Sequence, residues 1–183
     1  MSPAESHRTH AAAFTARVEG VTDGRWDATA PVEGWVARDV VRHLVEWLPA
    51  LLGGGAGVEL KRGPSADEDP AAAWAVHRDA VQELLDDPAT AELVLSNPHI
   101  GEIPVPQAID SFYTPDVFMH TWDLARATGQ DETLDPDMCR QLFEGMQPME
   151  EMLRASGQYG PRVAVPEDAD VQTQLLGFIG RRP

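Results

Sequence analysis

Residues 36–52 read VARDVVRHLVEWLPALL, and this stretch decides the fold class of the chain. Apolar side chains recur along it at intervals of three and four residues, at Val36, Val40, Leu44, Trp47 with Leu48, and Leu51. One face of an α-helix presents its residues at this spacing, so the stretch predicts an amphipathic helix with one buried face. The run Gly53-Gly54-Gly55-Ala56-Gly57 follows. It lacks the Gly-Lys-Ser/Thr ending of a phosphate-binding loop, and we interpret it as a flexible connector that ends the helix.

Helical spacing also dominates the rest of the chain, and no convincing stretch alternates between apolar and polar residues as a half-buried strand does. The pattern predicts further helices over about 4–19, 70–87 and 106–128, from Asp135 onward, and over about 170–180. Four prolines between residues 88 and 106 predict mostly irregular chain there. We therefore expect an all-α fold: a four-helix bundle with an additional C-terminal helix and a short terminal segment, with residues 1–183 forming a single domain.

Two of these helices contain residues that disfavour a regular helix. Pro115 predicts either a kink or a restart, with Thr114 as the cap and Pro115 in the first turn. Gly145 and Pro148 predict an irregularity near the middle of the helix that begins at Asp135.

The chain is acidic and contains a single cysteine. Its 183 residues are 43% hydrophobic and include 14 basic against 30 acidic side chains, a formal net charge of −16. This charge repels nucleic-acid phosphates and anionic lipid, so we expect no nucleic acid and no membrane among the partners. Cys139 alone cannot form an internal disulfide or a cysteine-based metal cluster. We see neither a signal peptide nor a run of about 18 apolar residues, and we expect a cytoplasmic protein.

Two histidines and one aspartate are the strongest candidates for a functional site. His43 comes three residues after Val40 and four before Trp47, so it lies on or beside the buried face of the helix over 36–52. Asp116 and His120 are four residues apart, which places both on one face of their helix with Cβ atoms roughly 5–6 Å apart. That spacing suits two ligands of one cation. A surface carboxylate, or an Asp–His hydrogen bond without metal, fits the same spacing.

Asp123 and Arg126 follow the candidate ligands on the same helix. Asp123 is three residues past His120, so it could orient the His120 imidazole as a hydrogen-bond acceptor or pair with Arg126 at the surface. Arg126 could bind a carboxylated substrate, or it could interact with the helix dipole or a salt-bridge partner.

The remaining histidines and the tryptophans have no decided role. His77 lies on the apolar stripe between Trp74 and Val81 and rivals His43 on pattern alone. We leave the roles of His7, His10 and His99 open, as well as that of His77. The tryptophans at positions 35, 47 and 122 are expected mainly in the core, with a pocket wall as the alternative. Cys139 shows no sign of activation, so we do not expect a catalytic thiol.

Three segments carry a resemblance to a known superfamily. DVFMHTWDLARATG, beginning at Asp116, and WVARDVVRHLVEW, beginning at Trp35, resemble helices of the DinB-like superfamily. More closely, they resemble the metal-binding N-terminal domains of mycothiol-dependent maleylpyruvate isomerases. The tail GPRVAVPEDADVQTQLLGFIGRRP resembles an uncharacterised metal-binding branch from actinobacteria. The resemblance implies that His43, Asp116 and His120 are the three metal ligands.

The resemblance also implies a type of chemistry. The isomerases have glutamate where Asp116 stands, and they carry a further C-terminal domain with a catalytic arginine, which we do not expect here. We therefore expect metal binding without maleylpyruvate isomerisation. The implied function is transfer or isomerisation on a small electrophile, with mycothiol as the thiol cosubstrate and a divalent metal, zinc rather than nickel or iron.

Two other functions stay open. One is a non-catalytic metal- or ligand-binding module with a stress-related or sequestering role. The other is a metal-free bundle that acts through protein contacts. We assign no catalytic residue, no particular substrate and no oligomeric state.

Overall fold

The computed structural model describes residues 1–99 and 101–183. Helices make up most of it, which confirms the predicted all-α fold class. The chain divides into two compact units, Met1–Asp131 and Glu132–Pro183. That residues 1–183 form a single domain stays a prediction. Among the described residues, no helix is both long enough and apolar enough to cross a bilayer.

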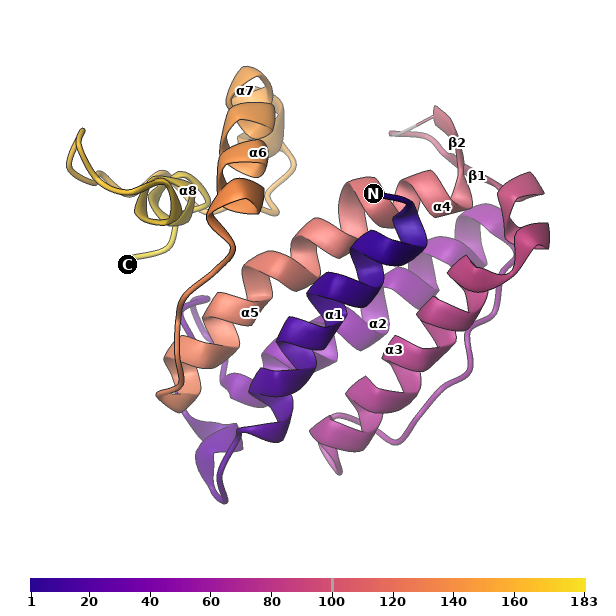
Figure 1. The fold of residues 1–183 in the computed structure, drawn as a ribbon, viewed down its shortest axis with the longest axis horizontal. Helices are drawn as coiled ribbons and strands as arrows, with labels where there is room; N and C mark the ends of the chain where they lie inside the picture. Colours follow the sequence, from indigo (N-terminus) through magenta and orange to yellow (C-terminus); the bar gives the residue numbers. More distant parts are fainter. Residues whose placement is uncertain (100) are drawn as a thin grey trace. The chain divides into compact units, whose positions relative to one another are not determined.

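Four helices run side by side in the first unit (Figure 1). They are α1 (Pro3–Glu19), α2 (Ala37–Ala56), α3 (Pro70–Asp86) and α5 (Thr114–Thr128). α1 packs against α3 and α5, and α2 packs against the same two helices. The four helices therefore form a closed bundle, as the hydrophobic spacing predicts.

The core lies between these helices. The rings of Phe14 from α1 and Trp74 from α3 meet edge to face with centres 4.5 Å apart. Trp74 Nε1 donates a hydrogen bond to Thr15 Oγ1 at 2.9 Å, so the indole is buried with its polar atom satisfied. From α2, Leu44 and Leu48 are buried in the same cluster. The apolar stripe of residues 36–52 thus faces the core as expected.

α2 continues past its predicted end at residue 52. Gly53 to Ala56 are helical, and the helix ends at Gly57, whose φ of +64° is in the left-handed region. The interpretation of this run as a flexible connector is wrong. Gly55 shows why glycine suits this position: an added Cβ would lie 2.5 Å from Leu95 Cδ1 and 3.0 Å from the Ser96 carbonyl oxygen. The helix needs a residue without a side chain where the segment at Leu95 crosses it.

We expect a matched pair of substitutions to separate the low helix propensity of glycine from the close approach of another segment at Gly55. Gly54→Ala meets no atom within 4 Å, so it should stabilise the protein by about 0.5–1 kcal/mol through better helix propensity. Gly55→Ala should destabilise it by about 1–3 kcal/mol because the backbone at Ser96 must move. Urea unfolding followed by circular dichroism measures both. Equal effects of the two changes would contradict the close approach at Gly55.

A β-hairpin occupies part of the segment expected to be irregular. Pro88–Glu92 form a 3₁₀ turn, and β1 (Val94–Asn97) then pairs antiparallel with β2 (Gly101–Pro104). Leu95 is fully buried, and β1 packs against α2. Strands of four residues are too short to show a clear alternation of apolar and polar residues, and the prolines mask the rest of the signal. The prediction of mostly irregular chain is therefore wrong for this hairpin.

The predicted break near Pro115 takes the form of a π-helical turn. α4 (Val105–Ala108) continues into a π-helical turn at Ile109–Tyr113 and then into α5. A proline ring clashes with the carbonyl four residues earlier, here Ser111, which lies within this wider turn. Thr114 is not the cap of α5, because the chain is already helical before it; the predicted cap is wrong.

The second unit is helical as well. α6 (Pro136–Met146) and α7 (Glu150–Ala155) are separated by a 3₁₀ turn at Gln147–Met149, which confirms the predicted irregularity. α8 (Val171–Phe178) begins with Asp170 accepting a hydrogen bond from the Thr173 backbone N–H at 2.9 Å. α6 packs against α8. Burial raises the pKa of Cys139 to about 11, helped by two nearby aspartates, so this thiol stays protonated at neutral pH.

Candidate metal centre

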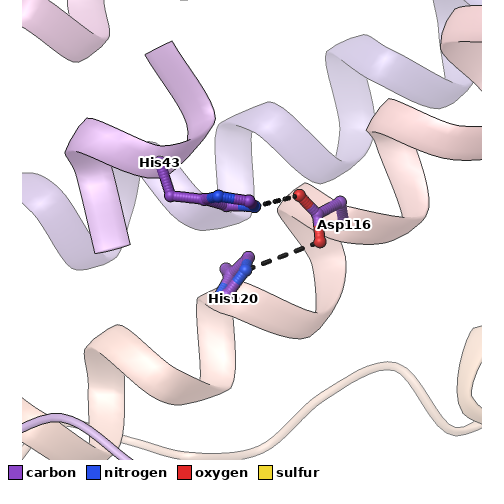
Figure 2. Close-up of side chains that lie close together, drawn as sticks. All are labelled: His43, Asp116 and His120. Atoms are coloured by element: carbon purple, nitrogen blue, oxygen red, sulfur yellow. Dashed lines mark hydrogen bonds and ion pairs between the residues drawn. The ribbon is translucent and has the colours of Figure 1, made fainter. Parts of the chain in front are cut away.

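The three candidate ligands lie together between two helices of the bundle (Figure 2). His43 projects from α2, while Asp116 and His120 project from successive turns of α5. His43 Nε2 lies 2.9 Å from Asp116 Oδ2, and His120 Nε2 lies 3.5 Å from Asp116 Oδ1. One ligand atom from each residue lies within 4.8 Å of the other two. The structure therefore brings together the three residues singled out in the sequence.

The cluster extends from the surface of the bundle inward. The side chain of His43 is 32% exposed, that of Asp116 is 20% exposed and that of His120 only 6%. Burial raises the pKa of Asp116, but the charge of His120 and the contacts from His43 outweigh it and lower the pKa below its ordinary value. Asp116 is therefore an anion at neutral pH, at a point that solvent can reach past His43.

A buried carboxylate fixes the orientation of the His120 ring. His120 Nδ1 lies 2.8 Å from Asp123 Oδ2, and Asp123 has no exposed surface. An ionised carboxylate can only accept hydrogen bonds, so it holds the imidazole proton on Nδ1 and leaves the lone pair on Nε2. That nitrogen faces Asp116. Asp123 therefore has the position expected of a hydrogen-bond acceptor for His120, and it is buried rather than at the surface.

Two tryptophans border the cluster. The Trp35 ring stacks on His120 with ring centres 5.7 Å apart and lies 5.2 Å from the ring of His43. Trp47 Nε1 donates a hydrogen bond to Asp116 Oδ2 at 2.9 Å. Both indoles are half-buried, whereas Trp122 is buried as expected for a core residue. The spacing of His43 and Trp47, four residues apart on one helix face, is the signal that could have placed Trp47 at the site.

Arg126 lies elsewhere on α5. Its guanidinium carbon is 5.2 Å from the centre of the Trp122 ring, a cation–π contact. Six residues separate it from His120, which is about 9 Å along the helix axis and on a different side of the helix. The suggested substrate role of Arg126 stays a prediction.

The rival histidine, His77, belongs to a separate buried cluster. Its Nε2 lies 2.9 Å from the Tyr113 hydroxyl, and burial, with a smaller contribution from the charge of His7, lowers the pKa of His77 to about 3. His7 Nδ1 contacts Gln82 Oε1 at 2.9 Å. The His10 ring meets Phe118 edge to face, and His99 is exposed in the turn that follows β1.

Comparisons with known proteins give two full-length relatives. They are uncharacterized proteins of Mycobacterium tuberculosis, one from strain CDC 1551 / Oshkosh and one from strain ATCC 25618 / H37Rv. Each is 26% identical to this chain over 190 residues, covering 99% of this chain and 98% of the relative. No protein-family model matches the chain, and no solved structure matches it. The relatives show that a chain of this length occurs in an actinobacterium, and their names state no activity.

Proposed function

We propose that His43, Asp116 and His120 bind one divalent metal ion, with which the protein activates a small thiol for reaction with a small electrophile. The observation that supports this is the convergence of the three ligand atoms to within 4.8 Å of one another. The resemblance to the DinB-like superfamily, and to mycothiol-dependent isomerases within it, suggests that the thiol is mycothiol.

The donor set fits a first-row divalent ion. Two imidazole nitrogens and one carboxylate are ligands of catalytic zinc sites, and the same set also suits nickel or ferrous iron. A carboxylate that accepts from the second nitrogen of a metal-binding histidine is a common companion of such sites, and Asp123 has this position next to His120. Zinc is the ion we favour.

Three protein ligands leave coordination positions for solvent or substrate. A bound divalent ion lowers the pKa of a water or thiol ligand, which provides a nucleophile at neutral pH. The side chains around the three ligands determine how a substrate can reach the ion. His43 leaves the cluster open to solvent on one side, and the half-buried Trp35 offers an apolar face against which the organic part of a substrate can pack. Such chemistry requires a reduced thiol pool, so we place the protein in the cytoplasm.

A thiol-consumption assay tests the enzymatic part of this proposal. Zinc-loaded protein is mixed with mycothiol and 1-chloro-2,4-dinitrobenzene, from which attack by the thiolate sulfur forms a C–S bond and releases chloride. We expect consumption at least about tenfold above the uncatalysed rate, a modest acceleration for an enzyme. His120→Ala protein provides the control for metal-dependent turnover.

The outcome also separates the two candidate functions. The enzymatic function would be overturned if the protein bound stoichiometric metal but showed no turnover on a panel of electrophiles, with zinc, nickel and iron each tried. It would leave a metal- or ligand-binding module as the function of the cluster. Protein that binds none of these ions would overturn both the enzyme and the metal-binding module.

A further inference from the structure

A second candidate site lies between α2 and α3, and it does not depend on the proposed metal site. A cavity of about 370 Å³ opens there, lined by α2, α3 and residues 61–66 of the loop between them. Its volume is at the lower end of the range for small-molecule sites, about 300–1,000 Å³. It is therefore large enough for a small organic ligand.

Two unpaired cations line this cavity. Lys61 and Arg62 are both exposed, and neither has a hydrogen bond or an ion pair to any residue within 1–99 or 101–183. The other basic side chains of the described chain do have interaction partners, for example Arg8 with Asp86 and Arg38 with Asp27. In a chain with 30 acidic and 14 basic residues, two adjacent cations without a carboxylate partner are unusual. They are available to an anion from outside the chain.

The rest of the lining is mostly apolar or uncharged. Val45 and Pro49 from α2 and Ala73 from α3 contribute apolar surface. Glu46 is the one acidic lining residue, so the two cations outnumber it. His77 also lines the cavity, and its Nε2 lies 2.9 Å from the Tyr113 hydroxyl. Burial keeps this ring uncharged at neutral pH.

We propose that this cavity binds a small organic carboxylate. The carboxylate pairs with Lys61 and Arg62, and the apolar body of the ligand packs against Val45, Pro49 and Ala73. Ion pairing to two cations gives charge-assisted hydrogen bonds, which are stronger than neutral ones. An inorganic anion such as phosphate would leave the apolar walls without a partner, so the lining favours a ligand with a hydrocarbon part.

Benzoate is the probe we choose, and Lys61 provides a local reporter. Because Lys61 is the only lysine, reductive methylation with ¹³C-formaldehyde labels this side chain and the N-terminal amine alone, and it keeps both charges. We expect benzoate to shift the Lys61 methyl signal in a saturable way and to leave the N-terminal signal unchanged. Neutral benzamide should shift neither.

Variants test the contribution of charge. Ligand-observed NMR should give a benzoate Kd about tenfold weaker for Arg62→Ala, the expected loss for one charged hydrogen bond. Arg140→Ala is the matched control, because it removes an exposed positive charge in α6 that pairs with Asp137 and does not line the cavity; its Kd should stay within about twofold. The proposal is overturned by an unchanged Lys61 signal, by equal losses in both variants, or by phosphate binding where benzoate does not.

Discussion

Replacing His120 with alanine should remove the metal ion from the protein. Elemental analysis of purified wild-type protein is expected to give about one divalent ion per chain, and His120→Ala protein less than about a tenth of that. The reason is geometric: Nε2 of His120 is held toward Asp116 by the hydrogen bond on its other ring nitrogen, and truncation to alanine removes that nitrogen. Protein from the native host is the right sample, because overexpression can load the wrong ion.

Two further variants keep this result interpretable. His120 is buried, so its removal also leaves a small void; His43→Ala changes a partly exposed ligand and should lose the metal with less effect on folding. His99→Ala removes an exposed histidine outside the cluster and should keep the full metal content. If both ligand variants retained the metal, the ion would bind elsewhere in the protein.

Asp123→Asn should weaken metal binding without abolishing it. Asparagine has nearly the same shape, so the packing of the fully buried side chain is retained, but its neutral amide no longer supplies the charged acceptor for His120 Nδ1. Substitutions of this kind typically cost about 10–100-fold in metal affinity. Competition with a chromophoric chelator measures the change.

The control is a carboxylate that does not contact the cluster. Asp79 is exposed on α3 and pairs with Arg78, so Asp79→Asn makes the same chemical change away from His120. It should leave the metal affinity unchanged within about twofold. If Asp123→Asn also left the affinity unchanged, Asp123 would be a structural partner of His120 with no influence on the metal.

The sequence predicts the helices of this fold well because each buries a face in one common core. The spacing along residues 36–52 is enough to orient α2, and the spacing of Asp116 and His120 is enough to place both on one side of α5. Their meeting with His43 depends on how α2 packs against α5, which no local pattern encodes. The helical pattern alone leaves His43 and His77 as rivals for the third position, and the structure brings His43 to the other two residues.

Features that depend on contacts between distant segments cannot be predicted from local sequence patterns. Gly55 looks like a helix breaker until Leu95 is seen to lie across it. Trp35 precedes α2 and looks like a core residue, yet its ring stacks on His120 from the other helix of the site. The short hairpin is stabilised by packing on α2, so its own residues show little of the sequence pattern that predicts a strand.

The donors of the candidate centre come from segments 73 residues apart in the chain, as the pair His43 and Asp116 shows. A disordered chain must close that long loop before it can offer the same pair of donors, at a cost in entropy. An ion bound between α2 and α5 would thus act as a removable cross-link that binds the native state far better than the denatured one. The supply of free metal would then set how long each copy of this protein resists unfolding and degradation.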